Sequence, residues 1–339
     1  MKKCFIICWF GVLPEYFPAW AKSCEYNQDF NFLIFTDNEI KYKLPKNVFF
    51  HHLDKTEFLK RCKFLGAKIS LDKPYRLCDF RPMYGEIFKD ELKQYDFWGY
   101  CDIDLIFGDI NKYIQSTDFE SYEAIFNGGH FTLIRNNAKM NSLFKAKGAI
   151  FDYKTVIKRE AIYAFDETTG FQRIARTNGV YAKFGIPYVE TESKYKQLRS
   201  RLEKENPDNQ CFYWDNGKLY RAKEEKGEVY YQELAYIHLQ KRNLILKDLD
   251  FDNSTSFWIL PDGFMIKEYS GIPSVEDIHR MNPNDGIEAR NKEEKIYKRN
   301  KMIAILKRNP FQIYVRLKQQ FAGINANDGS KEAMEWIKY

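Results

Sequence analysis

Short apolar runs alternate with amphipathic segments along the first half of the chain. The apolar runs have the length of buried strands, and the segment after the first run, PEYFPAWAKSC (14–24), is typical of a helix opened by proline. The predicted strands are KKCFIICWFG (2–11), FNFLIFTD (30–37) and NVFFHHL (47–53). Strands that alternate with helices indicate an α/β fold with a parallel sheet, whose ligands lie at the carboxyl ends of the strands. The residues expected to edge that crevice are Trp9, Phe10, Gly11 and Asp37.

The segment KPYRLCDFRPMYGEIFKDEL (73–92) is predicted to be a helix. Asp79 is a good N-cap, Pro82 is tolerated in the first turn, and an apolar stripe follows. Arg81 would then lie at a helix N-terminus, which already favours anions. Two interpretations stay open for Arg81: an ordinary surface arginine, or a contact to a donor phosphate or sugar.

The apolar run FWGYCDIDLIFGDI (97–110) should be a buried strand, yet it carries Asp102 and Asp104 near its middle. On a continuous strand, residues two apart point to the same face. Two adjacent carboxylates repel each other unless a cation lies between them, and Mg²⁺ or Mn²⁺ is suited to that role. The alternative is that one aspartate caps a turn and the other is solvated. We expect Asp109 to cap a turn or helix before Ile110.

Later segments complete the predicted architecture. YEAIFNGGHFTLIRNN (122–137) is expected to be a strand or hairpin, with glycines where the backbone approaches something closely. FDETTGFQRIA (165–175) is expected to begin a helix whose first turn carries Asp166 and Glu167. The remaining predicted elements are hairpins at 212–222, with an Asn-Gly turn, and at 257–266, a strand with His238 within 229–242, and a helical tail from Ile287 to Gln320 broken at Asn309-Pro310.

Composition narrows the class of protein. No apolar run is long enough to span a membrane, and the apolar N-terminus is expected to be a core strand because it lacks a signal-peptide cleavage site. The seven cysteines form no C-x-x-C pair, which argues against a disulfide framework or zinc knuckle and for the cytoplasm. Ten Lys or Arg against three Glu between Glu288 and Gln320 account for the net charge of +6. A nearly neutral body with a basic tail is not typical of a nucleic-acid-binding protein.

His238 is the candidate third metal ligand among five histidines. It lies in a strand-like run, and Lys241 follows three residues later. A histidine in such a run is unremarkable as a core residue. Beside a phosphate-binding lysine, however, it would complete a charge-balanced diphosphate site.

The order of these motifs resembles the GT-A glycosyltransferases. RPMYGEIF (81–88) and YCDIDLIFGDI (100–110) are similar to segments of the family 8 galactosyltransferases. The longer string CDFRPMYGEIF, GYCDIDLIFGDI, GGHFTLIRN, FDE and HLQKR looks like an uncharacterised bacterial group found with polysaccharide and O-antigen genes. The resemblance covers about residues 1–245. It implies a GT-A catalytic domain at 1–250, with a nucleotide-binding half (1–110) and a sugar and acceptor half (111–250), before a C-terminal hairpin and basic helical extension (251–339).

The resemblance also implies a UDP-sugar donor and a metal, Mn²⁺ or Mg²⁺, on Asp102, Asp104 and His238. The residues implied to contact the donor or its sugar are Arg81, Lys241, Asn127, Gly128 and Gly129. One departure weakens the role of Lys241: family 8 ends in H-x-x-G-x-x-K-P-W, whereas HLQK here brings the lysine closer and lacks that glycine.

The expected reaction transfers a galactose-type hexose to a glycan or lipid-linked acceptor in the synthesis of bacterial surface polysaccharide. Asp166 or Glu167 is the candidate general base, against the alternative that both only cap a helix. Glu167 stands where family 8 has an amide, which favours inversion. The rival functions are a non-catalytic sugar- or assembly-binding protein on the same fold, and a sugar nucleotidyltransferase, whose G-x-G-T-R loop is missing.

The basic tail is expected to touch the anionic cytoplasmic face of the membrane. Its predicted apolar face consists of Phe311, Tyr314, Val315 and Phe321. The alternative is that this face packs on the catalytic domain and the basic residues are only solvated.

Overall fold

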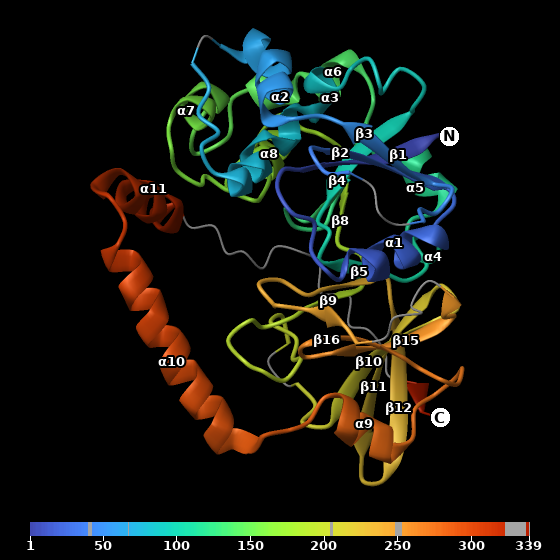
Figure 1. Ribbon diagram of the computed structural model, residues 1–339. Coiled ribbons are helices and arrows are strands. Elements are labelled where there is room, and N and C mark those ends of the chain that lie inside the picture. The colour runs from blue at the N-terminus through green and yellow to red at the C-terminus, as the bar shows by residue number, and fades with distance from the viewer. Residues whose placement is uncertain (40–42, 67, 204–205, 248–252, 323–336, 339) are drawn as a thin grey trace.

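The computed structural model describes residues 1–39, 43–66, 68–203, 206–247, 253–322 and 337–338. Its described elements form two large sheets joined by a small one, and helices cover the first sheet on both faces (Figure 1). The expected α/β class is therefore confirmed in the form of a mixed sheet flanked by helices.

The first sheet has seven strands in the order β3-β2-β1-β4-β7-β6-β8 within the described residues. Strands β3, β2, β1 and β4 run parallel, β7 is antiparallel to β4 and to β6, and β8 is parallel to β6. The strands are β1 (Lys3–Trp9), β2 (Phe30–Thr36), β3 (Val48–His52), β4 (Phe97–Cys101), β6 (Ala124–Phe126), β7 (Phe131–Arg135) and β8 (Ala182–Phe184). The predicted strands near the N-terminus and the predicted hairpin at 122–137 are thus confirmed.

Alternate side chains of β1 enter two different cores. Cys4 and Ile6 pack on one side of the sheet, and Phe5 and Ile7 pack on the other, as a strand buried on both faces requires. The first side is covered by α2 (Lys55–Arg61), α3 (Tyr84–Ile87), α6 (Ala138–Asn141), α7 (Tyr153–Lys158), α8 (Phe171–Thr177) and the 3-10 helices η1 (Cys62–Leu65), η2 (Pro74–Met83) and η3 (Leu143–Lys145). The second side is covered by α1 (Phe17–Glu25), α4 (Ile110–Tyr113) and α5 (Ser116–Ser121).

A second sheet collects the later hairpins in the order β14-β16-β15-β10-β11-β12-β17. Its strands are β14 (Ile245–Leu246), β16 (Gly263–Ile266), β15 (Ser256–Leu260), β10 (Gln210–Asp215), β11 (Lys218–Glu225), β12 (Glu228–Leu234) and β17 (Ile337–Lys338). The predicted Asn216-Gly217 turn is confirmed, because both residues have positive φ, 48° and 86°. The boundary predicted at residue 250 runs between strands of this one sheet, since β15 pairs with β10.

A three-stranded sheet joins the two halves and consists of β5 (Leu105–Phe107), β13 (Tyr236–His238) and β9 (Tyr188–Glu190). β13 pairs antiparallel to β5, and His238 lies opposite Leu105. The predicted continuous strand over 97–110 is therefore wrong: β4 ends at Cys101, the chain turns through Asp102 and Asp104, and β5 changes partner. As expected, Asp109 caps α4, since its carboxylate accepts the backbone N–H of Lys112.

The C-terminal extension is helical, as predicted. After α9 (Val275–Met281), α10 (Gly286–Leu306) runs from the second sheet back to the first, and α11 (Pro310–Phe321) follows it (Figure 1). Asn309 caps α11 at the predicted break. Within the described part of the chain, no helix combines the length and apolar character needed to cross a membrane.

Candidate metal and substrate site

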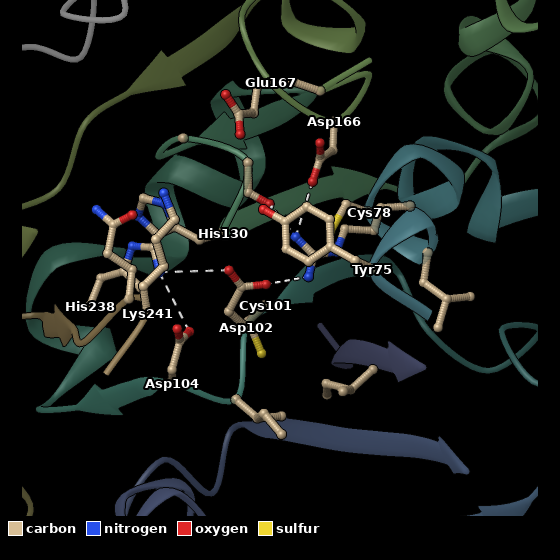
Figure 2. A pocket seen from close by; sticks show the side chains of 18 of the residues that line it. Tyr75, Cys78, Cys101, Asp102, Asp104, His130, Asp166, Glu167, His238 and Lys241 are labelled. Atoms are coloured by element: carbon tan, nitrogen blue, oxygen red, sulfur yellow. Dashed lines mark hydrogen bonds and ion pairs between the residues drawn. The ribbon is translucent and has the colours of Figure 1, made fainter. Parts of the chain in front are cut away.

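A cavity of about 680 Å³ opens at the carboxyl ends of β1 and β4, and Figure 2 shows part of its lining. Eleven of the residues predicted for the site line this cavity: Trp9, Phe10, Arg81, Asp102, Asp104, Gly128, Gly129, Asp166, Glu167, His238 and Lys241. Segments far apart in the sequence therefore meet at the sheet edge where an α/β fold binds its ligands.

Three predicted residues do not line the cavity. Gly11 and Asp37 contact each other, because the Gly11 N–H donates to Asp37 Oδ1 at 2.9 Å. Asn127 is buried, and its amide donates to the hydroxyl of Tyr236 and to the carbonyl of Ile186. These hydrogen bonds hold the loop before Gly128 in place. Because Asn127 is buried and outside the cavity lining, the predicted contact of its side chain with a sugar does not fit this structure.

Asp102, Asp104 and His238 converge at one point of the cavity wall (Figure 2). His238 Nε2 lies 3.4 Å from Asp104 Oδ1 and 3.7 Å from Asp102 Oδ2, and one ligand atom from each residue lies within 4.8 Å of the others. The convergence follows from the β5–β13 pairing, which places the end of β13 beside the start of β5.

The electrostatics of this cluster reflect closely spaced carboxylates. Burial raises the pKa of Asp102, and Arg81 offsets only part of that effect. Burial also acts to raise the pKa of Asp104, but the charge and hydrogen bond of His238 bring it below the usual range. Against the effect of burial, the charge and hydrogen bond of Asp104 raise the pKa of His238.

These three residues fit a divalent cation. Two carboxylates and an imidazole are ligands that Mn²⁺ accepts, and Mg²⁺ accepts the carboxylates. A cation would supply the positive charge that two neighbouring carboxylates require. The buried Nδ1 of His238 has no hydrogen-bond partner among the described residues, and Glu190 Oε1 lies 4.0 Å from it.

Arg81 links Asp102, a candidate metal ligand, to the loop that carries Asp166 and Glu167. Its guanidinium donates to the carboxylate of Asp102, to Asp166 Oδ2 at 3.0 Å and to the carbonyl of Gly129 at 2.9 Å. The interpretation of Arg81 as an ordinary surface residue is wrong, because its side chain is only 16% exposed. Its contact with a phosphate or sugar stays a prediction.

The predicted N-cap role of Asp79 is also wrong. Residues 74–83 form the 3-10 helix η2, and Asp79 lies inside it with its carboxylate turned to a different segment. That carboxylate accepts the backbone N–H groups of Tyr163, at 3.2 Å, and Phe165, at 3.1 Å. Asp79 thus fixes the loop that leads to Asp166.

Asp166 and Glu167 lie in this loop and not in a helical turn. Helix α8 begins at Phe171, so neither acid caps it, contrary to expectation. Asp166 is 2% exposed and paired with Arg81, whereas Glu167 is exposed to the cavity. Because the cavity walls enclose this carboxylate and remove it from bulk water, desolvation raises the pKa of Glu167, together with the charges of Glu190 and Asp102. Gly129 is required beneath them, because a Cβ there would lie 2.5 Å from Glu167 Cγ.

Sequence reasoning missed His130. Its ring lies 4.3 Å from that of His238 between centroids, and its Nε2 lies 2.9 Å from the Tyr236 hydroxyl. Burial, followed by the charge of His238, holds the pKa of His130 well below its ordinary value. Its position directly after Gly128-Gly129 was the available signal.

A second missed group lines the far side of the cavity. Arg201 donates to Glu190 Oε1 at 3.0 Å, and Gln240 donates to the same oxygen at 2.7 Å. Tyr75, Cys78, Tyr188 and Tyr16 also line the cavity. These residues come from separate loops and strands without a shared motif, so local sequence patterns gave no signal for them.

Comparison with protein families matches residues 5–268 to DUF6625, described as a family of unknown function. The searches of curated proteins and of solved structures found no match. The matched range contains the first sheet except for the first two residues of β1, the joining sheet and every residue of the Asp102–Asp104–His238 cluster. The chain belongs to DUF6625.

Proposed function

We propose that the protein is a metal-dependent glycosyltransferase of the GT-A type that uses a UDP-sugar as donor. The convergence of Asp102, Asp104 and His238 at the carboxyl end of β4, on the wall of a cavity of about 680 Å³, carries this proposal. The mixed sheet, with its parallel strands β3-β2-β1-β4 followed by the antiparallel β7, supports it.

The residues of the cluster would hold Mn²⁺ or Mg²⁺. The chemistry supplied by such an ion would be stabilisation of the negative charge on the departing diphosphate. Arg81 keeps Asp102 oriented towards His238, and it also ties Asp166 to the same site. Trp9 and Phe10, at the end of β1, offer apolar surface to the nucleotide.

Glu167 is the general base in this proposal. Asp166, the other candidate, is already paired with Arg81 and shielded, whereas the Glu167 carboxylate is exposed to the cavity. The acceptor hydroxyl would give its proton to Glu167, its oxygen would bond to the anomeric carbon, and the bond from that carbon to the UDP oxygen would break. Direct attack inverts the anomeric centre.

The substrate assignment rests on the resemblance to the GT-A enzymes. We propose a galactose-type hexose as the transferred sugar, and a glycan or lipid-linked acceptor of bacterial surface polysaccharide synthesis. A sugar-binding protein without turnover shares the same geometry but would not release UDP.

Thermal unfolding in the presence of UDP and Mn²⁺ tests the site. The ligand pair should raise the melting temperature, and Asp104→Asn should abolish that gain. Asp109→Asn is the matched control, because Asn keeps the helix cap of α4. No gain at millimolar UDP would refute the site and the class together.

Release of UDP from a panel of UDP-sugars separates an enzyme from a binding protein. An enzyme should show slow hydrolysis of at least one donor without an acceptor, and Asp104→Asn should remove it. A gain in melting temperature without hydrolysis or transfer of any donor would favour the binding protein.

A further inference from the structure

A second cavity, of about 430 Å³, adjoins the first. The two share lining residues, namely Tyr75, Ile162, Lys241 and Arg316. Helix α11 forms one wall of the second cavity, and the start of η2 with the loop at 160–162 forms another. A group that occupies the second cavity would therefore lie next to a ligand of the first.

The lining of the second cavity is strongly basic. Four cations line it: Lys73, Lys241, Arg308 and Arg316. A fifth, Arg76, is committed elsewhere, because its guanidinium donates to the backbone carbonyls of Val156, Arg159 and Ala161. Glu160 is the one acidic residue in the lining that the structure describes.

The four cations lack partners in the described part of the chain. Their side chains make no hydrogen bond or ion pair there, in contrast to Arg81, which bridges Asp102 and Asp166. Like charges around one cavity repel one another, and the repulsion is relieved when an anion enters. Arginine forks and lysine ammonium groups are the side chains that bind phosphate oxygens.

Lys241 links this cavity to the candidate metal site. It follows His238 closely and lines both cavities. Its φ of 59° is a left-handed backbone conformation that residues other than glycine seldom adopt. The strained turn directs the chain away from β13 directly after His238.

The C-terminal extension completes the cavity. Helix α11 is fixed to the first half of the chain, because Val315 is buried and Gln319 Nε2 donates to the Tyr163 carbonyl at 2.6 Å. Arg308 and Arg316 are held at the cavity by this packing. The extension therefore supplies two of the four cations that line the second cavity.

We propose that the second cavity binds a phosphate or diphosphate group of the acceptor. The assignment to the acceptor rests on the proposed function: the donor diphosphate would lie at the metal in the first cavity, whereas Lys73 and Arg308 line only the second cavity and so remain for a second anion. The binding of the anion itself rests only on the cavity and its charges.

Titration with inorganic pyrophosphate in the presence of EDTA tests the anion site, because metal-mediated binding at Asp102 and Asp104 is then absent. We expect saturable binding by calorimetry, weakened about tenfold or more in a Lys73→Gln/Arg308→Gln variant. Both side chains reach solvent, so the variant should keep the melting temperature of the parent. Arg299→Gln, an exposed arginine on α10 outside both cavities, is the matched control.

Pyrophosphate binding that is absent, or equal in the double variant and the parent, would overturn the inference. Asp104→Asn separates this result from the proposed function, since it should abolish the gain from UDP and Mn²⁺ but leave metal-free pyrophosphate binding unchanged. Farnesyl diphosphate in detergent distinguishes two sources of the diphosphate. Binding at least about tenfold tighter than that of pyrophosphate assigns a lipid-linked acceptor, because apolar contacts then add to the anion site; equal affinity assigns a water-soluble phosphorylated glycan.

Discussion

The imidazole of His130 lies against that of His238, with 4.3 Å between the ring centroids. His130 is therefore a positioning residue for the candidate metal ligand. We expect His130→Ala to weaken Mn²⁺ binding about tenfold, because the His238 ring loses its support, whereas His130→Phe keeps the ring contact and most of the affinity. Electron paramagnetic resonance of free Mn²⁺ measures both. Equal weakening in the two variants would show that the contact to the Tyr236 hydroxyl matters and the stacking does not.

Glu167→Gln should separate chemistry from binding. The variant keeps the shape of the side chain but cannot accept a proton, so sugar transfer should fall by about 10²–10⁴-fold. The gain in melting temperature from UDP and Mn²⁺ should remain, since Glu167 is not among the candidate metal ligands. Glu276→Gln, on the exposed side of α9, is the control. Unchanged transfer in Glu167→Gln would exclude it as the base.

Asp79 gives the fold a predicted pH dependence. Burial raises the pKa of its carboxyl to about 6, above its value of about 4 in the unfolded chain, although Arg76 and two backbone N–H groups oppose the shift. The folded state then holds a proton that the unfolded state has lost, so this residue's contribution to the free energy of unfolding falls as the pH rises from about 4 to about 6. Asp79→Asn removes the titration.

Urea unfolding of the parent and Asp79→Asn at pH 5 and pH 7 checks this sign. The parent should lose about 1 kcal/mol more than the variant over that interval. A parent that gains stability relative to the variant would mean that the pKa of Asp79 is lowered in the folded protein.

The C-terminal helices expose only part of the apolar face that was expected. Phe311 and Val315 pack on the first half of the chain, and Tyr314 contacts Phe151, as the alternative of packing on the domain required. Tyr314 and Phe321 of the expected face are 50% and 86% exposed, and the other exposed large apolar residues of α10 and α11 are Ile287, Ile296, Tyr297, Met302, Ile303, Ile305, Leu306, Ile313 and Leu317. Basic residues of α10 and α11 lie among these exposed apolar residues in the sequence. A contact between these residues and anionic lipid therefore stays a proposal.

A Leu306→Ser/Phe321→Ser variant tests the lipid contact, because these side chains are 80% and 86% exposed. Co-sedimentation with vesicles rich in anionic lipid should fall several-fold relative to the parent. Phe49→Ser, an exposed apolar residue on the edge strand β3, is the control. Binding that is equal in all three proteins would refute the contact.

Local patterns predicted most of the elements. The strands β1 and β2 are continuous apolar runs, and Asn-Gly favours the positive φ angles that the turn at Asn216-Gly217 needs. Each of these elements is therefore determined by residues that are neighbours in the sequence. The strand over 97–110 was predicted wrongly because its apolar run serves two different sheets. Nothing in the run itself marks the change of partner at Asp102.

Most residues of the candidate site were predictable, but the contacts between them were not. Acidic residues in apolar surroundings pointed to Asp102 and Asp104, and these do meet His238. The partners of Arg81 and Asp79 could not be predicted. Arg81 binds Asp166 and Asp79 binds the backbone of Tyr163, and each partner lies more than 80 residues away in the sequence. Such contacts depend on the tertiary fold, which a local pattern does not contain.

The register of β5 with β13 also has a consequence for folding. Asp104 and His238 stand at the two ends of a long stretch of chain, and the strand pairing closes that stretch into a loop. An ion held by both residues would act as a reversible cross-link, comparable to a disulfide that forms only after β13 has docked on β5. Loading with metal would then report that the chain has been synthesised and folded at least as far as His238, so that a shorter chain would lack the complete site.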